Sequence, residues 1–169
     1  KHGKTTAVEA QLDDFDHLRW DFTASLTIDD LEAEPKAFAV TYGMWPELII
    51  VDNLSNVVPD AEGDSSSYIA LERVCEYLHE LARTTGACVV ALHHVKGDSN
   101  DGNAPVPLSQ IKGQIGRVPE MILTLHRIGD DGSRQMGVSV VKNRTGRADA
   151  SGAMILYLDA DMERMRLTG

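Results

Sequence analysis

The chain has 169 residues, with 43% hydrophobic and 25% charged side chains, a composition that suits one globular domain with a sizeable core. No apolar run approaches the roughly 18 residues that a membrane helix needs, and no signal peptide opens the chain, so a membrane protein is not expected. The net charge of −10 argues against a nucleic-acid ligand, but the charge is unevenly distributed. Residues 93–148 carry eight basic and five acidic side chains, and such a local basic segment can attract a polyanion.

The opening residues, KHGKTT, contain Gly3-Lys4-Thr5, which matches the end of the phosphate-binding P-loop, G-x-x-x-x-G-K-[ST]. The first glycine of that motif would precede residue 1. The next segment, AVEAQLDDF (7–15), has the narrow apolar stripe of a surface helix, whereas a P-loop helix packs beneath a sheet. A true phosphate loop and an accidental match are both open; we favour the accidental match, with the P-loop upstream of this chain.

A strand–helix–strand unit is predicted in the middle of the chain. Before it, LRWDF (18–22) could form a strand, and residues 27–42 a helix capped by Thr27 and Asp30. LIIVD (48–52) and CVVALHH (88–94) have the apolar runs of buried parallel strands. Residues 66–85 between them have helical apolar spacing, and Gly86 follows where a helix would end. This order predicts an α/β fold with a mainly parallel sheet.

The two cysteines, Cys75 and Cys88, lie in a predicted helix and a predicted strand without metal-binding spacing, so both are expected to be buried free thiols. Residues 97–118 contain several glycines and prolines and little periodicity, which indicates a long loop, and such loops are usually functional. MILTLHR (121–127) and GVSVVKNR (137–144) are predicted strands that pair antiparallel across a turn, and MILYLDA (154–160) is a last strand candidate.

Polar side chains follow the two predicted parallel strands, where α/β sheets bind ligands. Asp52 ends the first strand, and a carboxylate there can hold Mg²⁺ beside a triphosphate, or it can cap the next turn. His93 and His94 end the second strand and could hydrogen-bond a γ-phosphate. The alternatives are a metal-ligand pair, which adjacent strand residues serve poorly because they face opposite ways, and plain polar strand ends.

Two further groups are basic. Lys112, Gly113, Gln114 and Arg117 suit contacts with the phosphates of a nucleic-acid strand, although a solvated loop would have a similar composition. Lys142, Arg144 and Arg147 lie on an edge hairpin, which places them poorly for the domain's own phosphate site. They would suit the site of a neighbouring subunit, where an arginine stabilises charge during phosphoryl transfer. Surface cations that discourage edge pairing are the alternative.

Taken in order, residues 45–152 resemble the RecA-like motor domain of hexameric replicative helicases, the DnaB class and phage primase–helicases. ELIIVDNLSNVV resembles the Walker B strand, and ALERVCEYLHELARTTGACVVALHHVK resembles the helix and sensor strand. VPLSQIKGQIGRVPEMILTLHR resembles the DNA-binding loop and the strand after it, and VVKNRTGRADASG the K-x-R finger hairpin. Each motif is moderately specific, and their collinear order carries the resemblance.

The resemblance implies an ATP- and Mg²⁺-dependent DNA helicase motor that assembles as a ring, in the full-length protein a hexamer, on single-stranded DNA. Asp52 would bind Mg²⁺ and the nucleotide, His94 would sense the γ-phosphate, and Lys142 and Arg144 would complete the neighbour's site. The DNA contacts implied are Lys96, Lys112, Gly113, Gln114 and Arg117. A primase or helicase loader is an implied partner, and the cytoplasm of a bacterial or phage-infected cell the implied location.

In this interpretation one RecA-like domain, itself a fragment, spans residues 1–169. It comprises N-terminal helices and a strand (1–44), Walker B and sensor strands (45–96), the DNA-binding loop (97–118) and C-terminal strands with the finger hairpin (119–169). Lys112 stands where the family usually has arginine, and the loop lacks the family's acid. The catalytic glutamate stays unassigned because the upstream strand candidate offers Asp21 instead.

Three alternatives stay open. The chain could be a non-catalytic RecA-like module for DNA binding or assembly, which the absent P-loop would favour. It could be a relative of the RecA recombinases, against which the K-x-R hairpin argues. A metalloenzyme that uses Asp52, His93 and His94 is the third.

Overall fold

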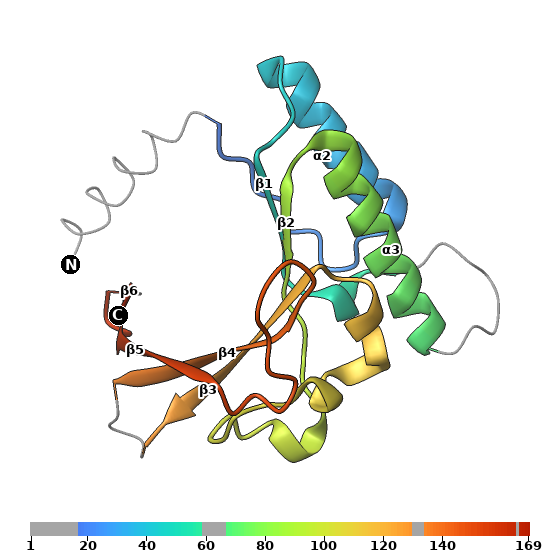
Figure 1. Cartoon of the computed structure of the whole chain (residues 1–169). Helices are drawn as coiled ribbons and strands as arrows, with labels where there is room; N and C mark the ends of the chain where they lie inside the picture. The colour runs from blue at the N-terminus through green and yellow to red at the C-terminus, as the bar shows by residue number, and fades with distance from the viewer. Residues whose placement is uncertain (1–16, 59–66, 130–133, 165) are drawn as a thin grey trace.

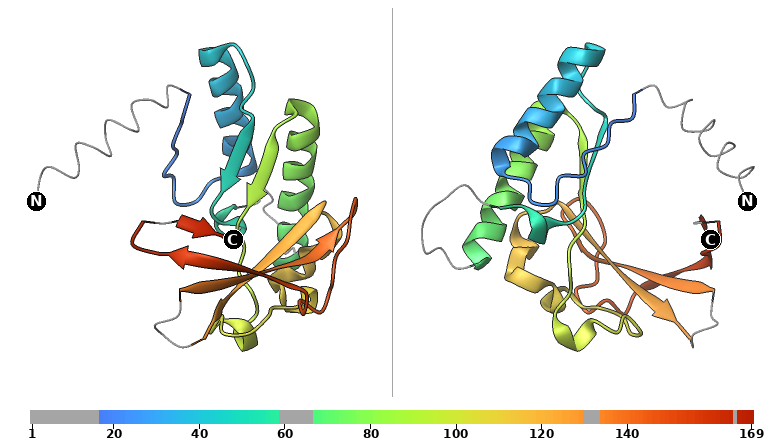
Figure 2. Two further views of the ribbon diagram at one scale, coloured as in Figure 1. Left: turned by 60° about the vertical axis from the view of Figure 1, so that its left-hand side comes forward. Right: turned by 180° about the vertical axis from the view of Figure 1, so that it is seen from behind.

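Two helices lie against one side of a short parallel strand pair, and a four-stranded antiparallel sheet lies beyond the carboxyl ends of that pair (Figures 1 and 2). This computed structural model describes residues 17–58, 67–129, 134–164 and 166–169. The Gly3-Lys4-Thr5 motif and the helix predicted over 7–15 lie outside the described residues.

The first described helix, α2, spans Ile28–Tyr42 as predicted. Thr27 and Asp30 form a capping box: the Asp30 amide donates to Thr27 Oγ1 (3.1 Å), and the Thr27 amide donates to Asp30 Oδ2 (2.9 Å). These bonds satisfy two amides that have no partner within the helix. Gly43 ends α2 with a left-handed φ of 74°, which glycine adopts without steric cost.

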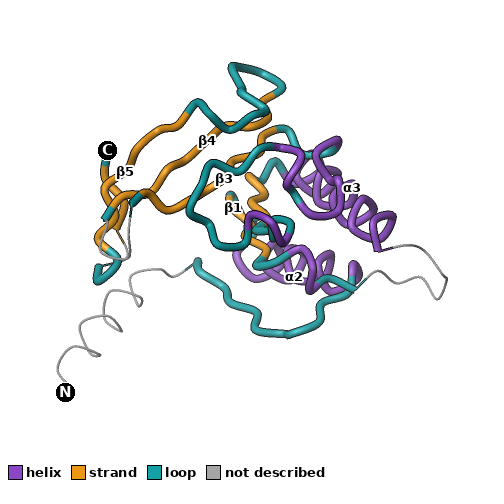
Figure 3. Tube along the Cα trace, turned by 90° about the horizontal axis from the view of Figure 1, so that it is seen from below, coloured by secondary structure: helices purple, strands orange, loops and turns teal. Residues whose placement is uncertain are grey.

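The predicted strand–helix–strand unit is confirmed. Strand β1 (Leu48–Val51) and strand β2 (Cys88–Ala91) pair in parallel, and α3 (Ser67–Thr85) connects them. The prediction that His93 and His94 end the second strand is wrong, because β2 ends at Ala91 and both histidines lie in the segment that follows it. Both helices lie on the same side of the pair (Figure 3). The core forms where they meet. It consists of buried side chains from α2, β1, the 3₁₀ helix η1 (Leu54–Asn56), α3 and the segments that follow: Leu31, Val51, Leu54, Val57, Val74, Cys75, Leu78, Leu81, Ile111, Ile115 and Val141.

The opposite face of the β1–β2 pair is exposed, so the prediction of two fully buried strands is wrong. Leu48, Ile50 and Val90 are exposed, as is Cys88, which corrects the prediction of a buried thiol there. Side chains alternate between the two faces of a strand, and the described helices cover only one face. Cys75 in α3 is buried as predicted, and burial raises the pKa of its thiol to about 11.

The second sheet has the order β3-β4-β5-β6, and all its pairs are antiparallel. Its strands span Met121–Ile128, Gln135–Asn143, Ile155–Asp161 and Arg166–Thr168, so three of them confirm the predicted C-terminal strands. The α/β class is therefore correct, but the expectation of a mainly parallel sheet is not. Among the described residues, parallel pairing of strands is confined to β1 and β2, because the connections between β3, β4, β5 and β6 are too short for parallel crossovers.

Two regions differ from the prediction, one expected to be a strand and one expected to be an irregular loop. Residues 18–22 are not a strand, because no described strand pairs with this segment; its Trp20 and Phe22 rings instead stack on each other with centroids 6.1 Å apart. The 97–118 loop contains three short 3₁₀ helices: η2 (Gly97–Ser99), η3 (Leu108–Gln110) and η4 (Lys112–Arg117). Another, η1 (Leu54–Asn56), follows β1. Neither described helix has the length and apolar character of a membrane span.

Candidate functional site

The segments after β1 and β2 run side by side, which brings Asp52 to the same sheet edge as the two histidines. The Leu92 amide donates to the Val51 carbonyl (2.9 Å), and the Leu54 amide donates to the Leu92 carbonyl (3.0 Å). Asp52 is exposed at this edge. The capping alternative for Asp52 does not hold, because the N-cap of η1 is Asn53, whose Oδ1 accepts from the Ser55 amide. The Asp52 carboxylate is therefore exposed to solvent and does not cap η1.

The two histidines have different environments. His94 is exposed, whereas His93 is half-buried and its Nε2 donates to the Lys112 carbonyl (2.8 Å). Because a carbonyl can only accept, this bond places the proton on Nε2. Burial lowers the pKa of His93, and the bond to Lys112 opposes that shift. The His93 side chain is thus bonded to the backbone of the loop, whereas the His94 side chain is exposed to solvent.

Residues 94–96 also pair directly with the 97–118 loop. Val95 and Ile111 form an antiparallel bridge, and the Lys112 amide donates to the His94 carbonyl (3.3 Å). The Lys96 amide donates to the Gln110 carbonyl (2.8 Å), and Lys96 Nζ donates to the Ser109 carbonyl (2.5 Å). The segment predicted to sense phosphate is therefore continuous, through backbone bonds, with the segment predicted to bind DNA.

The predicted DNA-contact residues of η4 fall into different environments. Lys112 and Arg117 are exposed, and Arg117 pairs with Glu72 of α3 at 3.7 Å. Gly113 is buried with a left-handed φ of 82°, and a Cβ there would lie 2.8 Å from Leu71 Cδ1. This packing explains why glycine stands at 113. Gln114 lies within η4, and its side chain is outside the described part of the structure.

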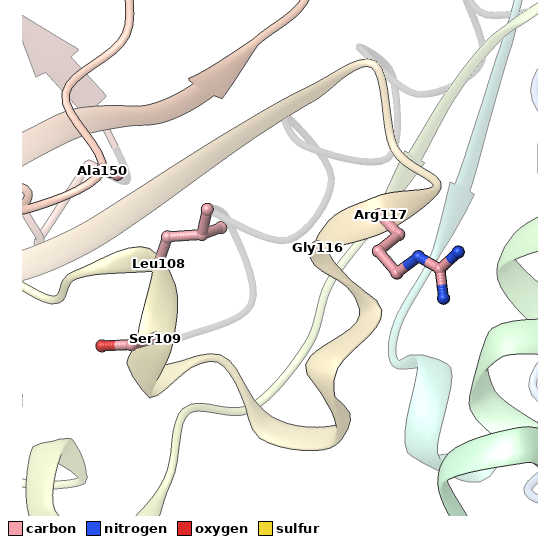
Figure 4. Close-up of a pocket in the computed structure, with 5 residues that line it drawn as sticks. All are labelled: Leu108, Ser109, Gly116, Arg117 and Ala150. Carbon is pink, nitrogen blue, oxygen red and sulfur yellow. The ribbon is translucent and has the colours of Figure 1, made fainter.

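An open depression of about 480 Å³ lies beside η4 (Figure 4). It is lined by Leu108, Ser109, Gly116, Arg117 and Ala150. In Figure 4 the Arg117 guanidinium points away from Leu108 and toward α3. The depression therefore presents mainly apolar and backbone surface at the junction of the loop with the turn that follows β4.

The predicted finger residues lie at the other end of η4 from the histidines. Lys142 Nζ donates to the Arg117 carbonyl (3.0 Å), and Arg144 Nη2 donates to the same carbonyl (2.5 Å). Arg144 Nη1 pairs with Glu120 Oε1 (3.2 Å). Burial, and then the nearby Arg144 charge, lower the pKa of Lys142. The last carbonyls of a helix have no hydrogen-bond partner within that helix. Here Lys142 and Arg144 donate to one of them, the Arg117 carbonyl.

The structure therefore forms two clusters, joined by η4. One holds Asp52, His93 and His94 at the edge of the parallel sheet, and the other holds Lys142, Arg144 and Glu120. The loop role of His93 and the pairing role of Glu120 were missed by sequence reasoning, because no spacing rule links either residue to a partner so distant in sequence. Among the described residues, no three His, Cys, Asp or Glu side chains gather as metal ligands, so the metalloenzyme alternative gains no support.

Two solved structures resemble this chain over most of its length. One is the structure of a DnaB-like replicative helicase and its interactions with primase, with a TM-score of 0.80 and 13% identity, covering 99% of this chain and 41% of that one. The other is the structure of an ATPase domain, with a TM-score of 0.72 and 15% identity, covering 86% of this chain and 52% of that one. The chain therefore has the α/β fold of the ATPase domain of DnaB-like replicative helicases, which confirms the predicted resemblance at the level of fold.

The sequence relatives are phage proteins. The chain is 50% identical over 162 residues to the Gene 65 protein of Mycobacterium phage L5, and 48% identical over 136 residues to the Gene 65 protein of Mycobacterium phage D29. These matches cover 95% and 80% of this chain but 60% and 59% of the phage proteins, so the chain spans about three fifths of the curated relatives it matches. No protein-family model matches the chain.

Proposed function

We propose that this chain is part of an ATP-dependent DNA helicase motor of the DnaB-like replicative type, acting as a ring on single-stranded DNA in a phage-infected cell. The observation that carries the proposal is the position of η4. In a fold shared with helicase ATPase domains, this segment is bonded at one end to the histidine edge and at the other to Lys142 and Arg144. A motor needs such a link between nucleotide chemistry and a DNA-binding segment.

The exposed carboxylate of Asp52 fits Mg²⁺, which prefers oxygen ligands and would neutralise charge on a bound triphosphate. Beside it, His94 would hydrogen-bond the terminal phosphate. A change at His94 would reach the loop through the bond between its carbonyl and the Lys112 amide. The Gly3-Lys4-Thr5 motif lies outside the described residues, so the interpretation of its P-loop match as accidental stays a prediction.

Lys142 and Arg144 would act on the nucleotide of the neighbouring subunit, which would make ring assembly necessary for turnover. Arginine suits this role because its fork of N–H donors matches phosphate geometry. Lys96, Lys112, Gly113, Gln114 and Arg117 would contact DNA along the loop. Lys96 would do so only after releasing the Ser109 carbonyl. One of the solved structures of this fold is described with its interactions with primase, and we propose a primase or a helicase loader as a partner here as well.

Subunit mixing tests the proposed role of Arg144. The experiment uses the product of the whole reading frame that contains this chain. In that protein, Arg144→Ala should lower ATP turnover at least about 1,000-fold, the range typical of arginine fingers. Nucleotide affinity, measured by fluorescent titration, should change less than about twofold, because the finger acts on charge that develops during transfer. Arg147→Ala, on the same exposed turn, is the matched control and should stay active.

Asp52→Asn should also be inactive, because it loses the carboxylate proposed to bind Mg²⁺. A mixture of inactive Asp52→Asn and Arg144→Ala subunits should recover turnover, since each supplies in trans what the other lacks. Full activity of Arg144→Ala alone, or no recovery in an assembled mixture, would refute the trans role. No ATP binding by the unmodified protein would instead support the non-catalytic module.

A further inference from the structure

The side chains of Arg144 and Glu120 meet where η4 gives way to β3. The Arg144 amide donates to the Glu120 carbonyl (3.0 Å), which extends the β3–β4 ladder by one pair beyond Met121 and Asn143. From this fixed backbone position, Nη1 of Arg144 reaches Glu120 Oε1 at 3.2 Å, and Nη2 reaches the carbonyls of Arg117 (2.5 Å) and Val118 (3.4 Å). Both terminal nitrogens of the guanidinium are therefore bonded within the same chain.

We infer that Glu120 is a positioning residue that withholds Arg144 from the neighbouring subunit until a phosphate displaces it. This inference rests on the proposed trans role of Arg144. A guanidinium binds phosphate best through two parallel N–H bonds from one edge of its fork. Here the two terminal nitrogens are divided between Glu120 and the end of η4. The edge formed by the two terminal nitrogens becomes free for a bidentate phosphate only when Arg144 leaves both partners.

The exposure of the pair sets how firmly Arg144 is held. The side chains of Arg144 and Glu120 are 47% and 54% exposed, so water competes for both. Exposed ion pairs of this kind shift an equilibrium by about fivefold at most. A charge-assisted bidentate contact with phosphate is stronger, so nucleotide at the subunit interface would open the contact. Glu120 therefore tunes the availability of Arg144 without blocking it.

Release of Arg144 would also affect the loop. The Arg117 carbonyl accepts from both Lys142 and Arg144, so departure of Arg144 removes one of the bonds that hold the C-terminal end of η4. The N-terminal end would stay attached through His93 and the His94 carbonyl. Engagement of a neighbour's nucleotide would thus loosen the end of the DNA loop that carries Arg117.

The first test measures this contact without nucleotide, by hydrogen exchange of residues 112–120 and 142–146 in the whole protein. Glu120→Gln removes the carboxylate charge with little change of shape, and exchange there should rise about two- to fivefold. Glu120→Asp keeps the charge and should restore slow exchange. Glu72→Gln is the matched control, because Glu72 pairs with the Arg117 side chain and not with Arg144. Unchanged exchange in Glu120→Gln would overturn the inference.

The second test separates a positioning role from a structural one. Glu120→Gln should raise kcat for ATP about two- to fivefold and leave KM unchanged, because Arg144 acts on charge that develops during transfer. The double variant Glu120→Gln/Arg144→Ala should be as inactive as Arg144→Ala. A lowered or unchanged kcat in an active ring would overturn the role of Glu120 and leave the proposed function standing. No ATP turnover by the unmodified protein would overturn the proposed function, and the regulatory role of Glu120 with it.

Discussion

Replacing Gly137 with alanine would place a methyl group inside the space occupied by the His126 ring. A Cβ on Gly137 would lie 2.2 Å from His126 Cε1 and 2.5 Å from Nε2, whereas non-bonded carbon atoms prefer about 3.5–4.0 Å. His126 sits directly opposite Gly137 in the β3–β4 register and is only 5% exposed. The ring cannot move aside without disturbing the buried face of the sheet.

The magnitude follows from two opposing contributions. Inserting an extra methyl group into a packed interior costs about 1–3 kcal/mol. Gly137 does not have a positive φ, so alanine meets no backbone strain there and recovers about 0.5–1 kcal/mol of strand stability. The 2.2 Å approach places the overpacking cost in the upper part of that range, at about 2–3 kcal/mol. We therefore expect a net loss of about 1–2.5 kcal/mol in the free energy of unfolding, which lowers Tm by about 2–10 °C in a domain of this size.

Urea unfolding of four proteins tests this reasoning: the unmodified chain, Gly137→Ala, His126→Ala and the double variant. Removing the ring removes the clash, so Gly137→Ala should be neutral or stabilising in the His126→Ala background. The difference between the two backgrounds should be about 1–3 kcal/mol, the range for residues in contact. An equal effect of Gly137→Ala in both backgrounds would refute the proposed clash.

Two other predictions concern stability. Gly113→Ala combines a φ of 82° with a Cβ 2.8 Å from Leu71 Cδ1, and should lower the free energy of unfolding by about 1–3 kcal/mol. Gly97→Ala, whose Cβ would meet nothing within 4 Å, is the control in the same urea titration, and equal losses would contradict the assignment. Burial lowers the pKa of His126, so the unfolded chain binds more protons below about pH 6.5 and stability should fall as the pH drops through that value. His126→Gln should lose less stability between pH 7 and 5, and parallel curves for the two proteins would exclude His126 as the cause.

Local signals in the sequence predicted the elements well. Thr27 and Asp30 marked the start of α2, and both capping bonds are present. Gly86 was expected to end α3 and has a φ of 77°, just after the last helical residue. Such signals are reliable because they depend on bonds and conformations within a few residues. The apolar runs of β1 and β2, with a helix between them, also predicted parallel pairing correctly.

Signals that depend on distant segments were less reliable. LRWDF has strand-like residues but meets no described partner strand, and Cys88 follows the strand pattern yet lies on the uncovered face. The capping role expected as an alternative for Asp52 belongs to its neighbour Asn53. In each case the outcome depends on which face or partner the chain meets after folding, and periodicity alone does not contain that information.

The sequence by itself determined the α/β class, the order of the elements and the positions of Asp52, Lys142 and Arg144 at strand ends, because apolar periodicity and capping act over short distances. Only the tertiary structure decided that His93 bonds the Lys112 carbonyl and that Arg144 pairs with Glu120. These contacts join residues 19 and 24 positions apart. They form because β-sheet register and the path of η4 bring those side chains together, and both arise only once the sheets and helices have packed.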